Sequence, residues 1–196
     1  MAIPFDPAIH LNRDESEFKQ FRSIVQRLNE KVQRDHVVQS TTQDLRNSLE
    51  VDRVVLYYFY KEWEGQVTFE ALSDDKYSIA GSTGPDQCFN GEYAALYLDG
   101  RVSAIANIET AEIAPCHHDF LHHIHVQANL VAPTLVEKDG SEPPEKERPE
   151  KEHPEKKLWG LLVAHHCQAP REWSAADISQ MKAGASRLAT ASALQR

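Results

Sequence analysis

The sequence contains a run of β-branched and aromatic residues, DRVVLYYFY at Asp52–Tyr60, which is typical of a strand. A turn at Lys61–Gly65 and a second strand at Gln66–Leu72 follow it, which predicts an antiparallel hairpin. Leu130–Glu137 and Leu158–His166 are the two strongest later strand candidates. Any fold of this chain therefore has to accommodate a sheet built from these four segments.

Amphipathic helices are predicted on both sides of these strands. Residues 14–49 have apolar side chains at three- and four-residue steps, either in one helix or in two helices that meet at a kink near His36. The tail, Ala175–Leu194, reads as an alanine-rich helix. This order of elements predicts an α+β fold, in which a central antiparallel sheet carries the N- and C-terminal helices on one face.

Shorter elements are predicted in the middle of the chain. Asn90–Asp99 reads as a helix that ends at Gly100, because glycine is common just past a helix C-terminus. Val102–Ile108 is a short strand candidate, and a short helix is expected to run through Leu121.

The length of 196 residues predicts one domain, residues 36–196, preceded by a helical arm, residues 1–35. An insertion at about residues 137–157 contains the repeats PEKER, PEKEH and PEKK, which have almost nothing to bury. Since such a segment cannot offset its ordering entropy, we interpret it as a solvated insertion at the end of a hairpin.

The formal net charge of −9 argues against a nucleic acid or an anionic membrane as the partner, because both bind clustered cations. No apolar run approaches the roughly 18–20 residues of a membrane-spanning helix. The N-terminus also lacks the apolar region of a secretory signal. We therefore expect a soluble, cytoplasmic protein, in which three cysteines are free thiols by default.

Cys116 is the cysteine best placed for chemistry. It lies in the run APCHH, just before a predicted short helix. A helix N-terminus and a protonated imidazole such as that of His117 both favour the thiolate, which is the nucleophilic form. From spacing alone, however, one Cys–His pair is a weak signal.

The other two cysteines lie in different settings. Cys88 follows Asp86 by two residues. That carboxylate either caps the next helix or faces a cationic ligand that the thiol also reaches. Cys167 ends an apolar strand and is interpreted as a packing residue.

The histidines permit a metal-site interpretation, since His118 and His122 are four residues apart and others follow closely. The sequence has no Cys-x-x-Cys, His-Glu-x-x-His, glycine-rich phosphate loop or Gly-x-Ser-x-Gly elbow. We therefore expect surface imidazoles rather than a metal centre, and neither nucleotide hydrolysis nor acyl transfer.

Seven blocks occur in a fixed order between about Val37 and Leu194. They are DRVVLYYF at Asp52, DQCF at Asp86, GRVSAI at Gly100, CHHDFL at Cys116, ANLVAPTL at Ala128, KLWGLLVAHHC at Lys157 and APREW at Ala169. Together they resemble the GAF domains of cyanobacteriochromes, relatives of the phytochromes. Their ordered co-occurrence is far more specific than any one block.

The resemblance implies a linear tetrapyrrole (bilin), phycocyanobilin or phycoviolobilin, which the domain attaches to itself covalently. Cys116 would form the thioether to the A-ring side chain, and His117 would pack against the central rings. DQCF resembles a dual-cysteine Asp-x-Cys-Phe motif, in which Asp86 accepts hydrogen bonds from pyrrole N–H groups and Cys88 adds reversibly to C10. His165 corresponds to the histidine near the D-ring.

The same resemblance implies how such a domain senses light. Addition of Cys88 to the C10 methine bridge divides the conjugated system, which then absorbs violet or blue light. Photoisomerisation between 15Z and 15E moves the methine, so that the thioether breaks and absorption at longer wavelength, green to orange, returns. The implied function is a photoreceptor rather than an enzyme, with terminal helices that pass the signal to an output domain or a homodimer partner.

Three positions depart from the family pattern and leave the colours open. Asn107 stands where aspartate is frequent, Gln127 where arginine is common, and Tyr77 in a region that often carries tryptophan. Two alternative functions remain. One is a GAF domain that binds a small molecule such as a cyclic nucleotide and leaves Cys116 idle, and the other is a metal-dependent enzyme built on the histidines.

Overall fold

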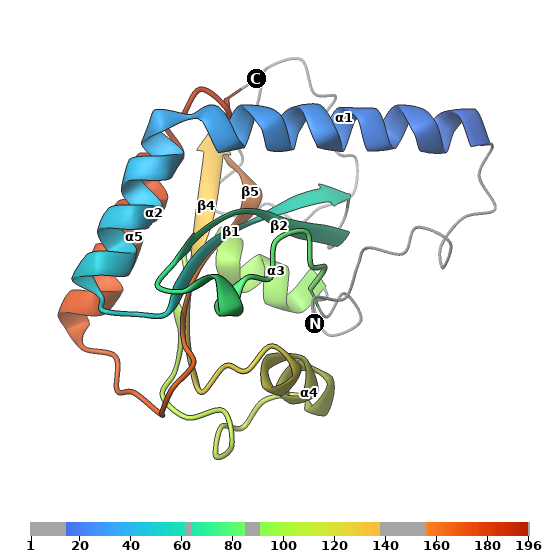
Figure 1. Cartoon of the computed structure of the whole chain (residues 1–196). Coiled ribbons are helices and arrows are strands. Elements are labelled where there is room, and N and C mark those ends of the chain that lie inside the picture. The colour runs from blue at the N-terminus through green and yellow to red at the C-terminus, as the bar shows by residue number, and fades with distance from the viewer. Residues whose placement is uncertain (1–14, 62–63, 85–90, 138–155, 196) are drawn as a thin grey trace.

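An antiparallel sheet runs through the centre of the protein, seen here in a computed structural model that describes residues 15–61, 64–84, 91–137 and 156–195 (Figure 1). Within these residues the sheet has five strands in the order β2-β1-β5-β4-β3. The strands are β1 (Arg53–Lys61), β2 (Glu64–Leu72), β3 (Ser103–Ile105), β4 (Ala128–Glu137) and β5 (Lys156–His166). The predicted hairpin and both predicted later strands are therefore confirmed.

Helices precede, follow and interrupt the strands. They are α1 (Glu15–Arg34), α2 (His36–Ser48), α3 (Gly91–Leu98), α4 (Pro115–His123) and α5 (Ala175–Leu188), with one 3-10 turn at Asp75–Tyr77. The predicted α+β class is confirmed. The described helices include none that is long and apolar enough to cross a membrane.

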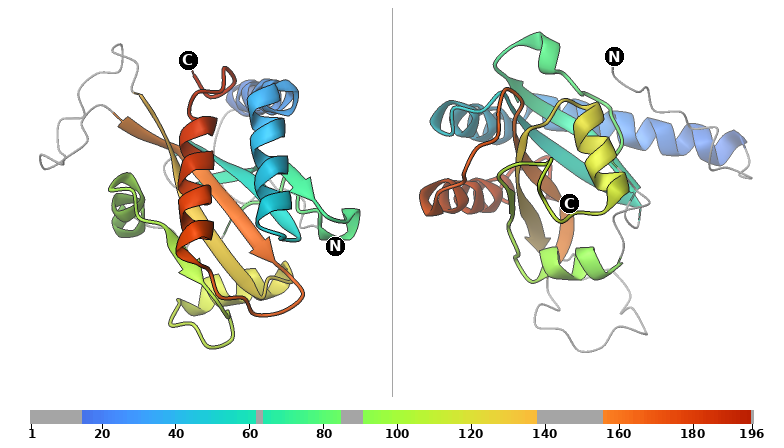
Figure 2. Two further views of the ribbon diagram at one scale, coloured as in Figure 1. Left: turned by 90° about the vertical axis from the view of Figure 1, so that its left-hand side faces the viewer. Right: turned by 90° about the horizontal axis from the view of Figure 1, so that it is seen from below.

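One face of the sheet carries α2 and α5, which lie side by side across it (Figure 2, left). Alternate strand residues such as Val54, Leu130 and Leu162 point to this face and form one apolar cluster with side chains of the two helices, for example Leu45 and Met181. The prediction that terminal helices share one face is therefore confirmed for α2 and α5.

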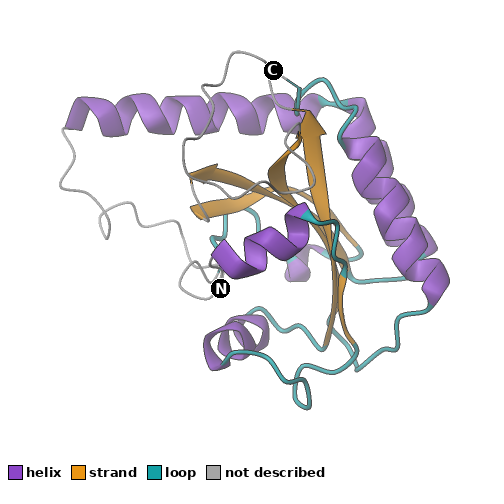
Figure 3. Ribbon diagram, turned by 180° about the vertical axis from the view of Figure 1, so that it is seen from behind, coloured by secondary structure: helices purple, strands orange, loops and turns teal. Residues whose placement is uncertain are grey.

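The opposite face belongs to a second apolar cluster. Val55, Val131 and Val163 each follow or precede a residue of the first cluster by one position, so the two-residue period of a strand turns them to the other side. Leu121 of α4 and Ile108 of the connecting segment pack against them. Figure 3 shows the sheet between its two helical layers.

The N-terminal helix α1 projects past the sheet (Figures 1 and 3). Its C-terminal part buries Leu28 and Val32 against the first cluster, whereas Ile24 is 46% exposed. The arm is thus attached to the domain by its last turns.

The predicted helix over residues 14–49 is two helices, because Asp35 ends one and caps the next. Its Oδ1 accepts hydrogen bonds from the backbone N–H of Val37 (2.8 Å) and of Val38 (3.3 Å). Its Oδ2 accepts from the Ser192 hydroxyl and from the Ala193 backbone N–H, both at 3.0 Å. One carboxylate therefore caps α2 and also holds the C-terminal tail.

We expect Asp35→Ala to lower the free energy of unfolding by about 1–2 kcal/mol, the usual cost of losing an N-cap. Asp35→Asn should be milder, because its one side-chain oxygen can still cap α2 but not also bind the tail. Urea denaturation of both variants measures the difference. Asp74→Ala is the matched control: this residue caps only a surface 3-10 turn, so a cost as large as that at position 35 would contradict the assignment.

The shorter elements differ from prediction in length. Gly100 has φ 81° just after α3, as predicted for a glycine at that position. The strand predicted over Val102–Ile108 is paired only over Ser103–Ile105. The helix predicted through Leu194 is wrong beyond Leu188, because the chain turns there and buries Ala191 and Leu194 in the first cluster.

Candidate functional site

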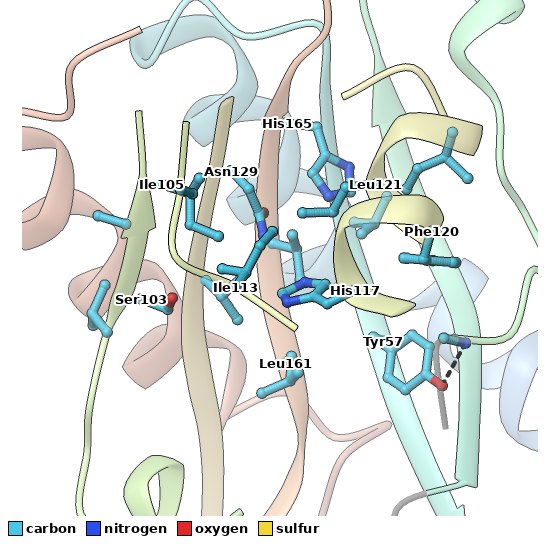
Figure 4. A pocket seen from close by; sticks show the side chains of 18 of the residues that line it. Tyr57, Ser103, Ile105, Ile113, His117, Phe120, Leu121, Asn129, Leu161 and His165 are labelled. Atoms are coloured by element: carbon cyan, nitrogen blue, oxygen red, sulfur yellow. Dashed lines mark hydrogen bonds between the residues drawn. The ribbon is translucent and has the colours of Figure 1, made fainter. Parts of the chain in front are cut away.

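A cavity of about 770 Å³ lies on the face of the sheet that α2 and α5 leave uncovered (Figure 4). Small-molecule sites usually measure about 300–1,000 Å³. Its walls come from β1, β4 and β5, from the segment around β3 and from α4. The apolar part of the lining includes Val55, Tyr57, Val67, Ile79, Ile105, Ile113, Phe120, Leu121, Val131, Leu161 and Val163.

The polar groups of the inner wall come from two elements of the sheet and one helix. His165 lies on β5, Asn129 on β4 and His117 on α4, and all three line the cavity (Figure 4). His165 is 4% exposed and Asn129 is 2% exposed. Mostly apolar walls with a few convergent polar groups are typical of a ligand-binding site.

Strand register places three polar residues in one row at this wall. His165 of β5 is paired with Arg53 of β1 on one side and with Asn129 of β4 on the other. The Nε–H of Arg53 donates to Nδ1 of His165 at 2.9 Å. Asn129 Oδ1 is buried and has no hydrogen-bond partner among the described residues. This amide oxygen can therefore still accept a hydrogen bond at this end of the cavity.

Both cavity histidines are held in the neutral form. Burial lowers the pKa of His165 well below its ordinary value, and the charge of Arg53 lowers it further. Burial alone lowers the pKa of His117. The site therefore presents two uncharged imidazoles to its ligand near neutral pH.

We expect the protein to lose stability as the pH falls below about 6.5, the ordinary pKa of histidine. Because the pKa of His165 is lower in the folded than in the unfolded chain, the unfolded chain binds the proton first, and stability falls between the two values. One such histidine contributes at most about 1.4 kcal/mol per pH unit.

Urea denaturation between about pH 5 and pH 8, the range in which histidine titrates, measures this slope. His165→Gln should remove its share of the pH dependence, whereas His36→Gln, at an exposed position, should leave the slope unchanged. Equal slopes in all three proteins would contradict the assignment.

Cys116 is next to this cavity in the chain but is not one of its lining residues. It is the second residue of α4, and its neighbours Ala114 and His117 line the cavity. The helix begins at Pro115, so Cys116 is inside the first turn, and its sulfur is in a disulfide, which corrects the expectation that all three cysteines are free thiols. The structure thus places His117 and His165 in one cavity, with Cys116 directly before His117 in α4.

Asp86 and Cys88 lie outside the described residues. The described chain that leads to them ends at Gly84, which lines the cavity. The backbone N–H of Gly84 donates to the Tyr57 hydroxyl at 2.9 Å, the bond dashed in Figure 4. The described chain before the DQCF block therefore ends at the cavity wall.

Cys167 differs from Cys116 in position and in chemistry. It follows β5, does not line the cavity, and is half-buried. Burial raises the pKa of its thiol to about 11, so the unreactive thiol form dominates near neutral pH.

The remaining histidines of α4 face outward. His118 lies 3.6 Å from a carboxylate oxygen of Glu109, and its ring stacks on that of His122 at 6.1 Å between centroids. Among the described residues no group of three His, Cys, Asp or Glu side chains could hold a metal ion.

Sequence reasoning assigned no role to Asn129, which lines the cavity, or to Arg53, which is hydrogen-bonded to the lining residue His165. Arg53 and Asn129 lie in the DRVVLYYF and ANLVAPTL blocks, where the sequence shows only a strand. The available signal was their polarity: each is a polar residue at the start of an otherwise apolar strand.

A family model and several curated proteins match most of this chain. The GAF domain family matches residues 33–191. An uncharacterized protein of Picosynechococcus sp. is 43% identical over 166 residues, which cover 85% of this chain and 91% of that protein. A putative methyl-accepting chemotaxis protein of Synechocystis sp. is 31% identical over 157 residues, which cover 80% of this chain but only 14% of that protein.

Solved structures show the same arrangement of elements. The cyanobacteriochrome receptor PixJ, solved dark and illuminated, has a TM-score of 0.60 and 28% identity, with 76% of this chain and 89% of that chain covered. The blue-light absorbing form of the Thermosynechococcus elongatus PixJ GAF domain has a TM-score of 0.62 and 23% identity, over 90% and 89% of the chains. The phycocyanobilin-bound GAF domain of a cyanobacterial phytochrome has a TM-score of 0.61 and 23% identity, over 92% and 93%.

Proposed function

The chain belongs to the GAF domain family, and we propose that it is a photoreceptor whose cavity holds a covalently attached bilin. One observation supports this proposal: Cys116 directly precedes His117 in α4, and His117 and His165 both project into a large cavity. A cysteine next to the cavity in the chain could anchor a ligand that the two imidazoles contact inside. A cyclic nucleotide would need neither the cysteine nor the flanking histidine.

The proposed attachment is an addition reaction that the domain carries out itself. The Cys116 sulfur donates an electron pair to the A-ring side chain of the bilin, a C–S bond forms as one C=C bond is lost, and a proton is added to the neighbouring carbon. Once a thiol reductant has opened the disulfide at Cys116, the atoms and electrons of the addition balance without an oxidant.

The cavity suits such a ligand in size and in character. Its apolar walls match the pyrrole rings and their alkyl substituents, and His117 is placed to pack against the central rings. Two of the structural neighbours are a cyanobacteriochrome receptor and a phycocyanobilin-bound domain, which makes phycocyanobilin, or its isomer phycoviolobilin, the first ligand to test.

Colour tuning is proposed to depend on Asp86 and Cys88. Asp86 would balance the charge of the protonated bilin, and Cys88 would add its sulfur to C10, which divides the conjugated system and shifts absorption to violet or blue. Isomerisation between 15Z and 15E would break this bond and restore green-to-orange absorption. A structural neighbour has a blue-light absorbing form, which supports testing this range of wavelengths.

Signal output is proposed to pass through the terminal helices. The projecting α1 has an exposed apolar residue, Ile24, and α5 packs on the sheet face opposite the cavity. Each is a candidate contact for an output domain or for a second copy of the chain.

Absorption spectroscopy of the protein, co-expressed with bilin-producing enzymes, tests the photoreceptor. We expect a coloured protein that switches between a short- and a longer-wavelength band under alternating violet and green-to-orange light. A colourless protein that binds a cyclic nucleotide instead would replace the proposal with that of a ligand-binding GAF domain, and a stoichiometric metal would favour the metal-dependent alternative.

A further inference from the structure

We propose that Arg53 is a positioning residue that holds His165 as the neutral tautomer protonated at Nε2, so that His165 offers the cavity a hydrogen-bond donor and no acceptor. The assignment of the tautomer stands without any ligand. The identity of the group that accepts this hydrogen bond rests on the proposed function, a bound bilin.

The first step is the direction of one hydrogen bond. A guanidinium group has donors and no acceptor, so the bond of 2.9 Å between Arg53 Nε and His165 Nδ1 requires a lone pair on Nδ1. A neutral imidazole with its lone pair on Nδ1 carries its proton on Nε2. An imidazolium cannot accept this bond, because both of its nitrogens are donors.

The second step is that Arg53 cannot readily turn away. Its side chain is 1% exposed, and its two terminal nitrogens donate to the backbone oxygens of Tyr77 (2.5 Å) and Ile124 (3.1 Å). With both terminal nitrogens held in this way, the remaining guanidinium nitrogen, Nε, points its N–H toward His165 of β5. No carboxylate of the described chain forms an ion pair with Arg53, so its positive charge stays beside the imidazole and opposes protonation there.

The third step is where the Nε2 proton points. His165 lies on the cavity side of β5, in register between Arg53 and Asn129, and its ring faces the cavity (Figure 4). None of the described residues accepts a hydrogen bond from Nε2. The ligand therefore has to supply an acceptor at this end, and on a bilin the acceptors are a lactam carbonyl oxygen and a propionate oxygen.

Nuclear magnetic resonance of the reduced protein with ¹⁵N-labelled histidine tests the tautomer directly. We expect Nδ1 of His165 in the pyridine-like range and Nε2 in the pyrrole-like range, with the signals assigned by their loss in His165→Gln. A pyrrole-like Nδ1, or two equivalent protonated nitrogens, would overturn the proposal. This measurement uses the wild-type protein without bilin, so it remains decisive even if the bilin hypothesis fails.

Two variants at position 53 test the cause. Arg53→Met removes the donor, and we expect the roughly ten- to hundred-fold preference that a charge-assisted hydrogen bond provides to be lost, which moves both shifts toward averaged values. Arg53→Lys keeps a cationic donor and should restore part of the preference. A purely structural role for Arg53 predicts unchanged histidine shifts in every variant that folds, and that result would overturn the proposal.

Infrared spectra of the bilin-loaded protein then identify the acceptor. If His165 donates to the lactam, its carbonyl stretch moves in His165→Leu, whereas the carboxylate stretch moves if the donor serves a propionate. If neither band moves in a variant that retains its pigment, the proposed role of His165 as a hydrogen-bond donor is contradicted. A protein that retains no pigment instead contradicts the proposed function and leaves the tautomer result intact.

Discussion

Replacing Cys116 by alanine is expected to leave no pigment on the denatured chain, whereas the wild-type chain keeps its pigment in acidic urea. The reason is positional, since Cys116 is the cysteine whose neighbours in α4 line the cavity. Without a covalent bond, unfolding removes every contact that holds the bilin. The measurement is the absorption of the acid-denatured protein after co-expression, together with zinc-induced fluorescence of the band on a denaturing gel.

Cys167→Ala is the matched control for this experiment, because it also removes one thiol. Its thiol has a pKa of about 11 and does not line the cavity, so we expect full pigment retention. Equal retention in the Cys116 and Cys167 variants would exclude Cys116 as the attachment point.

Cys88→Ala is expected to abolish the short-wavelength band and to leave a pigmented protein that absorbs only at longer wavelength. Addition of sulfur at C10 divides the conjugated system, so a protein without that sulfur keeps the full length of conjugation in both photostates. Covalent attachment at Cys116 is not affected by this change. Absorption spectra before and after violet or blue illumination measure the result.

Cys88→Ser separates the thiol from the space that it fills. Serine is similar in size, but its hydroxyl is a far weaker nucleophile, so it should behave like alanine. A violet or blue band that persists in both variants would exclude the second thioether and leave a single-cysteine photoreceptor.

The sequence predicted those parts of the fold that depend on local patterns. The strand at Asp52–Tyr60 and the strand at Leu158–His166 show themselves in β-branched and aromatic residues, and Gly100 marks the end of a helix by its backbone requirement. The end of α5 at Leu188 was not predictable in this way. Alanine continues a helix as readily as it packs in a core, so burial of Ala191 under the sheet decides against the helix.

The site was predictable only where it resembles a family motif. Cys116, His117 and His165 were named from matched blocks, and the structure places both histidines in one cavity and Cys116 beside His117 in α4. The contribution of Arg53 was not predicted, because it depends on pairing with a residue 112 positions later in the chain. Strand register, which sets such a contact, is not visible in either strand alone.

Strand β5 is shared between the binding cavity and the helix layer. Val163 lines the cavity, while Leu162 and Ala164 pack in the cluster that α2 and α5 complete. Because these residues are consecutive along one backbone, the strand cannot shift toward the ligand without carrying its other side away from the helices. We therefore expect any movement of β5 on the cavity side to change how α2 and α5 pack on the opposite face.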